Sequence, residues 1–194
     1  MARPYRLQAP GAVYHVFAHA TDGCVLFAKR LDYEIFLLGF ADVLDRHGWA
    51  CLSYTLMTTH YHVVVQTPAG DIGDGMKRLN GCYAQGFNRR NGRKGHLFGD
   101  RYGSVHVTST EQLKSAVRYV DLNPVEAGMC ADPIEWEWGS HAAHLAAVPP
   151  SVRVPTDSVL RFFGPTPQVA RQRYRAFVLD GIAAAKSSQL RDGV

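Results

Sequence analysis

The sequence predicts an α+β fold with a ferredoxin-like βαββαβ core, and two observations carry that prediction. The first is the order of periodicities, because segments that alternate as strands are separated twice by longer segments with helical spacing. The second is a pair of apolar segments, 49–57 and 60–67, which almost touch in sequence and therefore indicate an antiparallel hairpin. Two helices would cover one face of the antiparallel sheet, and the other face would stay open.

Each element of this core has its own signal. The predicted order is a strand over 13–21, a helix over 31–47, the hairpin strands 49–57 and 60–67, a helix over 72–91 and a strand over 102–108. Gly48 follows the first helix, as glycine commonly does at helix C-termini. The expected buried stripes are Phe36, Phe40, Val43 and Leu44 in the first helix, and Ile72, Met76, Leu79, Tyr83 and Phe87 in the second.

A further helix is predicted after the last strand and is expected to lie on the open face. Ser109 and Gln112 form a capping-box pattern at its start, and Pro124 is predicted to end it. Its apolar stripe is Leu113, Ala116, Val117 and Val120. The acidic residues Glu111, Asp121 and Glu126 are predicted to lie on a solvated helix face.

His60 and His62 are the most informative residues, because side chains two apart in a strand point to the same face. Two imidazoles on one face begin a metal site, but a catalytic site usually needs a third protein ligand. Tyr119 and Asn123 lie four apart in the later helix, where a tyrosine nucleophile and an amide oxygen could reach that site. The alternative is a pair of ordinary strand histidines, a half-buried helical tyrosine and a helix-terminal asparagine.

His15 and His19 share one face of the first strand and are weaker candidates to approach the same site. Histidines of this kind are more often surface or core polar groups. The four cysteines are widely scattered and form no Cys-x-x-Cys pair, so neither a zinc ribbon nor a redox pair is indicated.

Composition and chain order predict one domain with an appendage. A chain of 194 residues with 46% apolar and 20% charged residues can bury one good core. Residues 1–141 are predicted to form that domain, and residues 142–194 a linker and C-terminal helical tail. The linker is placed at about 141–155, a short helix at 157–163, and a last helix from Thr166-Pro167 to Gly181. No signal peptide and no apolar stretch of membrane-spanning length are visible, which predicts a cytoplasmic protein without a membrane partner.

The ordered set of motifs resembles that of the REP-associated tyrosine transposases, in the single-tyrosine branch of the HUH endonuclease superfamily. The motifs are the His-x-His strand, the Tyr-x-x-x-Asn helix with its continuation to Gly128, and the segments 11–16, 95–104 and 138–140. The resemblance covers residues 10–141 and, more loosely, the tail. One departure is Thr58-Thr59, because the family usually has Pro-Asn at that position.

The resemblance implies a metal-dependent single-stranded DNA endonuclease and strand transferase. Tyr119 would form a 5′-phosphotyrosine intermediate, and His60, His62 and Asn123 would hold Mg²⁺ or Mn²⁺. The ligand set does not exclude zinc. The implied partners are single-stranded DNA hairpins of the repetitive extragenic palindrome type, and the implied location is the bacterial cytoplasm at the nucleoid. The resemblance leaves open whether the protein works as a monomer or as a homodimer.

The predicted DNA-binding surface follows the second helix, where basic residues neighbour aromatic rings that can stack on bases. Its residues are Arg89, Arg90, Arg93, Lys94, His96, Phe98 and Arg101. A solvated loop is the alternative for this segment. The net charge of +4 is weak support for a nucleic-acid partner, and Arg3–Arg6 could add a basic arm.

Three other functions stay open on the sequence. The first is a domesticated protein that binds hairpin DNA without transposition. The second is an RNA-binding module, because a βαββαβ sheet also suits single-stranded RNA, although aromatic residues would then be expected on the open face. The third is a metal-dependent hydrolase that forms no covalent adduct with DNA.

Overall fold

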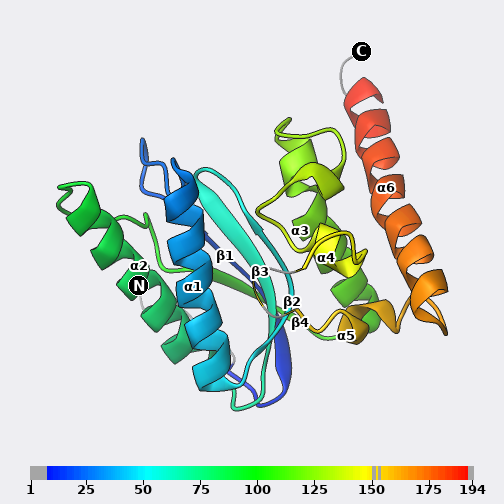
Figure 1. Ribbon diagram of the computed structural model, residues 1–194, viewed down its shortest axis with the longest axis horizontal. Coiled ribbons are helices and arrows are strands. Elements are labelled where there is room, and N and C mark those ends of the chain that lie inside the picture. Colours follow the sequence, from blue (N-terminus) through cyan, green and yellow to red (C-terminus); the bar gives the residue numbers. More distant parts are fainter. Residues whose placement is uncertain (1–7, 150–151, 153, 192–194) are drawn as a thin grey trace.

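A four-stranded antiparallel sheet forms the centre of the computed structural model, which describes residues 8–149, 152 and 154–191. The strands are β1 (Ala12–His19), β2 (Ala50–Leu56), β3 (His60–Thr67) and β4 (Gly103–Val107), in the spatial order β2-β3-β1-β4. Helices α1 (Arg30–His47) and α2 (Ile72–Arg90) cover one face, as Figure 1 shows. The predicted ferredoxin-like core is therefore confirmed. The basic arm predicted at residues 3–6 lies outside the described residues.

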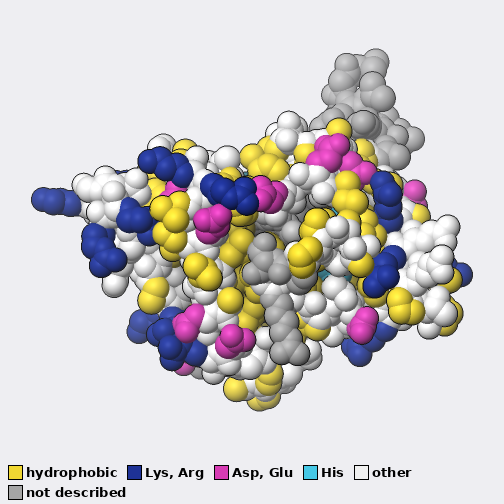
Figure 2. All heavy atoms as spheres, in the orientation of Figure 1, with side chains coloured by type: hydrophobic (Ala, Val, Ile, Leu, Met, Phe, Trp, Pro, Cys, Tyr) yellow, Lys and Arg dark blue, Asp and Glu magenta, His cyan; other side chains and the backbone are white. Residues whose placement is uncertain are grey.

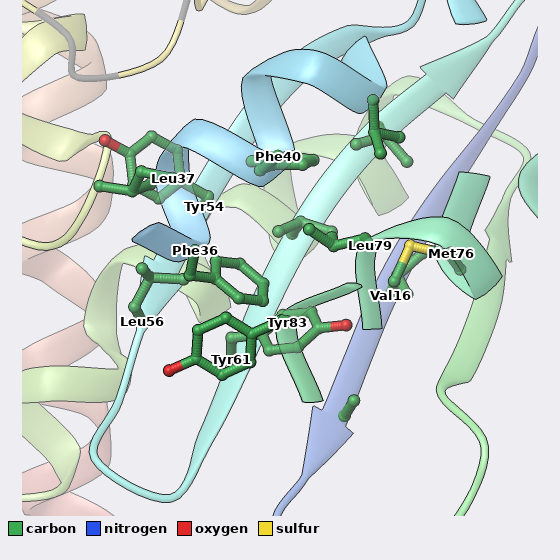
Figure 3. Close-up of a cluster of buried hydrophobic side chains, with 14 of the residues drawn as sticks. Val16, Phe36, Leu37, Phe40, Tyr54, Leu56, Tyr61, Met76, Leu79 and Tyr83 are labelled. Atoms are coloured by element: carbon green, nitrogen blue, oxygen red, sulfur yellow. The ribbon is translucent and has the colours of Figure 1, made fainter. Parts of the chain in front are cut away.

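The first core lies between the sheet and helices α1 and α2. Every residue predicted for the two helix stripes is buried there. Phe36 is central, because its ring lies 4.7 Å from that of Tyr61 and 5.2 Å from that of Tyr83, measured between ring centroids. Figure 3 shows these rings pointing toward one another from the strands and both helices. Helix α1 ends at Gly48, whose φ of 63° is the left-handed conformation that glycine adopts without strain.

Helix α3 (Thr110–Glu126) lies on the opposite face of the sheet and builds a second core. Leu113, Val117 and Val120 are buried there with Leu52 of β2 and Val64 of β3. At the start of the helix, the Ser109 hydroxyl accepts a hydrogen bond from the Gln112 backbone N–H. The Gln112 side chain bonds Thr108 instead of Ser109, so only half of the predicted capping box forms.

The predicted end of α3 at Pro124 is wrong, because the helix continues to Glu126 with proline inside it. Proline removes one backbone donor, but its fixed φ is compatible with helical geometry. The Ala127 backbone N–H donates to the Asn123 carbonyl at 3.0 Å, which closes the last turn. Asn123 therefore lies within a regular turn of helix.

The residues after α3 return to the free edge of β2 before they reach the tail. A 3-10 turn over Pro133–Glu135 precedes the Trp138-Gly139-Ser140 segment, where Gly139 pairs with Thr55 in an isolated antiparallel bridge. The Leu56 backbone N–H donates to the Trp138 carbonyl at 2.9 Å. This segment therefore covers part of the exposed sheet edge.

The first part of the tail packs against the rest of the fold. Helix α4 (His141–His144) opens the segment expected as a linker, and all four of its residues are buried. Val152 and Val154 belong to the first core. Residues of the segment predicted as a linker are therefore buried in the structure, and the domain boundary at residue 141 stays a prediction.

Helices α5 (Asp157–Leu160) and α6 (Pro167–Arg191) complete the fold, and α6 lies along the outer side of α3 (Figure 1). The helix passes through Gly181, where the sequence predicted its end. A Cβ atom at Gly181 would lie 2.6 Å from Leu122 Cδ1, so glycine permits the close approach of α6 to α3. In the described part of the chain, none of the helices has the length and apolarity needed to cross a membrane.

Candidate active site

Four histidines gather on the face of the sheet opposite to α1 and α2. His60 and His62 come from β3, and His15 and His19 come from the neighbouring strand β1. The imidazole rings of His60 and His62 lie 5.1 Å apart between centroids, and the ring of His19 stacks on that of His60 at 4.8 Å. His15 Nε2 lies 3.0 Å from His62 Nδ1, within hydrogen-bond distance. Strand alternation therefore places both predicted histidines and both weaker candidates in one cluster.

Helix α3 brings Tyr119 against this cluster. The Tyr119 ring lies edge-on to His62 with centroids 5.3 Å apart, and 5.6 Å from the ring of His15. Tyr119 is 45% exposed, so a phosphate in solution can approach its side chain. Residues 119 and 62 are distant in sequence, and their contact depends on the packing of α3 on the sheet.

Asn123 lies one turn further along α3 and is 9% exposed. Its Nδ2 donates to the Tyr119 backbone carbonyl at 2.9 Å, which fixes the amide, and its side chain raises the pKa of His60 against the larger lowering by burial. The Asn123 amide therefore lies near the His60 imidazole, which in turn lies 5.1 Å from that of His62 between ring centroids. Among the described residues, no group of three or more His, Cys, Asp or Glu side chains is arranged to hold a metal ion. The predicted ligand set differs from such a group because its third member is the amide of Asn123.

Three histidines of the cluster, His15, His60 and His62, have lowered pKa values. Burial lowers the pKa of His62 to about 3 and that of His15 to about 4. Burial also lowers the pKa of His60, and His19 adds to that effect. A neutral imidazole is the form that binds a metal ion, so the electrostatics and donor types of this cluster fit a divalent cation.

The bond between His15 and His62 was not predicted. When one ring nitrogen of a histidine is held by a partner, the other nitrogen is directed toward a ligand, which is the usual arrangement around metal-binding histidines. His62 Nδ1 faces His15, which leaves its Nε2 for such a ligand. The only signal in the sequence was that His15 and His19 share a strand face.

Backbone hydrogen bonds show why Thr58-Thr59 can replace the Pro-Asn pair that is usual in the family. The Thr58 carbonyl accepts from the backbone N–H groups of Leu26 at 2.9 Å and Phe27 at 3.1 Å, and the Thr59 carbonyl accepts from Ala20 at 2.8 Å. The turn before His60 is therefore held through its carbonyl groups, which any residue type supplies.

The predicted DNA-binding residues divide into two groups. Arg90 of α2 pairs with Asp32 of α1, and Arg93 donates to Asn88 and to the Cys24 sulfur, so both guanidinium groups have partners within the protein. Phe98 is partly buried and packs against the first core. The remaining members are exposed: Arg89, Lys94, His96 and Arg101.

This basic segment adjoins the histidine cluster. The Gly99 backbone N–H donates to the His19 carbonyl at 3.2 Å, and Phe98 forms an isolated bridge with Ala20 just beyond β1. A groove of about 790 Å³ lies between α2 and residues 95–102, with Lys77, His96 and Arg101 among its lining residues. Figure 2 shows Lys and Arg side chains over the end of the molecule that contains α2.

The sequence predicted Asp121 on a solvated helix face, and this prediction is wrong. Asp121 is 4% exposed and faces away from Tyr119, toward the tail. The Asp121 Oδ2 atom accepts hydrogen bonds from His141 Nδ1 at 2.8 Å and from the Tyr174 hydroxyl. Its partners are distant in sequence and carry no shared pattern, so nothing in the sequence indicated this contact.

Comparison with known proteins agrees with this geometry. Residues 13–123, more than half of the chain, match the family model described as "Transposase IS200 like". That match identifies the class of protein as a transposase, an enzyme that acts on DNA. The chain belongs to the IS200-like transposase family.

One solved structure shows the same fold. The chain is similar to a REP-associated tyrosine transposase bound to a REP hairpin, with a TM-score of 0.66 and 15% identity over 79% of this chain and 92% of that chain. It also has a weaker likeness to a protein of Deinococcus radiodurans R1 described as a transposase, with a TM-score of 0.42 and 16% identity over 59% of this chain and 91% of that chain. No curated protein matches the chain.

Proposed function

We propose that this protein is a metal-dependent single-stranded DNA endonuclease and strand transferase of the REP-associated, HUH type, with Tyr119 as its nucleophile. The observation that carries the proposal is the placement of the Tyr119 ring 5.3 Å from that of His62, in a chain of the IS200-like family. Because the Tyr119 and His62 rings that lie together belong to the same chain, the proposed chemistry would not require a homodimer.

His60, His62 and Asn123 would hold Mg²⁺ or Mn²⁺, which polarises the scissile phosphate when bound. The Tyr119 oxygen attacks phosphorus after its proton passes to solvent. The bond from phosphorus to the 3′ oxygen breaks, and that oxygen takes up a proton to become a free 3′-hydroxyl. The product is a 5′-phosphotyrosine, which conserves the energy of the phosphodiester. A later attack by another 3′-hydroxyl restores the tyrosine and joins new DNA ends.

The proposed partner is single-stranded DNA that contains a hairpin of the repetitive extragenic palindrome type. Support comes from the exposed cations Arg89, Lys94 and Arg101, in the segment whose Gly99 backbone N–H bonds the His19 carbonyl, and from the REP hairpin bound by the structurally similar transposase. Because the substrate is chromosomal, we place the protein at the bacterial nucleoid.

The test is a denaturing gel with labelled, hairpin-bearing single-stranded DNA from the repeats that flank the gene. Wild type, Tyr119→Phe and His60→Ala are incubated with Mg²⁺ or Mn²⁺. A covalent protein–DNA band is expected for wild type, and Tyr119→Phe should lose it by at least about 10³-fold, as is usual when a nucleophile is removed. An adduct that persists in Tyr119→Phe would show that another residue is the nucleophile.

Native gels on the same samples separate the other functions. Hairpin DNA binding without an adduct in any metal would indicate a domesticated DNA-binding protein. Metal-dependent cleavage without an adduct would indicate a hydrolase. Tighter binding to RNA of the same sequence would indicate an RNA-binding module.

A further inference from the structure

Asp121 joins four elements of the protein through one buried carboxylate. Its side chain is fully buried, and that of His141 is 2% exposed. The Oδ2 atom accepts from His141 Nδ1 of α4 at 2.8 Å and from the Tyr174 hydroxyl of α6. The Oδ1 atom accepts from Ser53 Oγ of β2 at 3.3 Å. Three donors from three elements thus converge on the back of α3.

The network continues into the sheet edge. Ser53 Oγ lies 3.1 Å from Ser140 Oγ, and Ser140 Oγ in turn accepts from the Tyr54 backbone N–H at 2.9 Å. A buried carboxylate is costly unless its oxygens are hydrogen-bonded, and a network of this kind favours one arrangement of the elements that supply the donors. The Asp121 network therefore fixes the position of α3 relative to β2, α4 and α6.

The tail also packs along α3 over several turns. The Arg118 guanidinium lies 4.4 Å from the centroid of the Phe177 ring, and the Lys114 ammonium lies 5.7 Å from that of Phe163. Leu122 meets α6 at Gly181, where the helices approach closely. Figure 1 shows α3 between the sheet on one side and α6 on the other.

We propose that Tyr174 and His141 are positioning residues, which act through Asp121 to hold Tyr119 and Asn123 against the histidine cluster. Asp121 lies two residues from each of them, so it faces the opposite side of the helix and moves with both. A shift of about 1 Å in a reacting group can lower a rate by about 100-fold. The C-terminal helices are then part of the catalytic unit. This inference rests on the function proposed above.

The decisive variant is Tyr174→Phe, which keeps a buried ring and removes only the hydroxyl. Tyr83→Phe is the matched control, because the Tyr83 hydroxyl is also buried and donates to the Leu26 carbonyl at 2.6 Å in the first core. The adduct is measured in a single turnover at saturating hairpin DNA with Mn²⁺, and hairpin affinity is measured separately. Tyr174→Phe should lower the rate by about 10- to 100-fold with the dissociation constant changed less than about twofold. Tyr83→Phe should change neither quantity.

Two further experiments test the positioning role separately from a general loss of stability and from the proposed chemistry. His141→Asn keeps an N–H donor near the position of Nδ1 and should retain more of the rate than His141→Leu. Amide hydrogen exchange of residues 113–126 is measured without DNA, and it should be faster in Tyr174→Phe than in wild type or Tyr83→Phe. If wild type forms no adduct, the proposed function fails while the exchange result still tests the positioning. An unchanged or higher adduct rate in Tyr174→Phe, or unchanged exchange, would overturn the inference.

Discussion

The two faces of the sheet differ in what their side chains contribute, and β3 shows the difference within one strand. Tyr61, Val63 and Val65 are fully buried under α1 and α2, where they belong to the first core. His60 and His62 point to the other face, where their pKa values are lowered and Tyr119 lies beside them. At the start of β3, strand alternation therefore places side chains that would carry the chemistry opposite to side chains of the first core, and further along the histidine face Val64 joins the second core.

Phe36→Ala should produce the largest effect, and the effect should be on stability. Phe36 is fully buried among aromatic rings, so its truncation should lower the free energy of unfolding by about 3–5 kcal/mol. Urea unfolding followed by circular dichroism measures the change. Leu38→Ala on the same helix is the control, because Leu38 is 72% exposed and its loss should cost less than about 0.5 kcal/mol. Equal effects of the two substitutions would contradict the assignment of the first core.

The histidine face should make stability depend on pH in metal-free protein. The pKa values of His62 and His15 lie at about 3 and about 4, below their ordinary value of 6.5, so the unfolded chain binds more protons between those limits. Stability should be complete above about pH 6.5 and should fall as the pH falls, by on the order of 4 kcal/mol between pH 7 and pH 5 for the two histidines together. His19, His60 and Tyr119 also face this cluster.

The pH effect is measured by urea unfolding in EDTA at both pH values. The double variant His15→Asn, His62→Asn should lose much of the dependence, whereas Phe36→Ala should keep it at a lower overall stability. A double variant with the same pH dependence as wild type would show that other groups cause it.

His15→Ala should weaken the use of metal without abolishing the fold. His15 holds His62 Nδ1 at 3.0 Å, and loss of such a partner typically costs about 10- to 100-fold in metal affinity or activity. The Mn²⁺ concentration that gives half of the maximal adduct rate should rise accordingly. His106→Ala is the control, since His106 lies on β4 beside the Tyr14 ring rather than in the histidine cluster. A Mn²⁺ requirement like that of wild type would mean that His15 does not orient His62.

The sequence was sufficient to predict features that depend on local periodicity. Every core strand and helix was predicted from alternation or helical spacing, and the shared face of His60 and His62 followed from strand geometry. The interactions that were missed join residues far apart in sequence. Asp121 meets Tyr174 across 53 positions and His15 meets His62 across 47, and single polar residues carry no periodic signal. Gly181 was misread because a close helix contact and a helix end both favour glycine.

Arg101→Ala should give the smallest effect, and the effect should be on DNA affinity alone. Arg101 is exposed and lines the groove beside α2, at the end of the basic segment that adjoins His19. Loss of one phosphate contact on a single strand should lower the slope of log affinity against log salt by about 0.7 and weaken binding only a few-fold. Fluorescence anisotropy with labelled hairpin DNA at several salt concentrations measures both quantities.

The control is Arg46→Ala, which removes the same charge, but Arg46 lies in the last turn of α1, where it pairs with Asp42. Because Arg90 at the end of α2 pairs with Asp32 near the start of α1, Arg46 lies at the far end of that helix pair. If both substitutions lower the slope equally, the protein binds DNA through its net charge rather than through the groove beside α2.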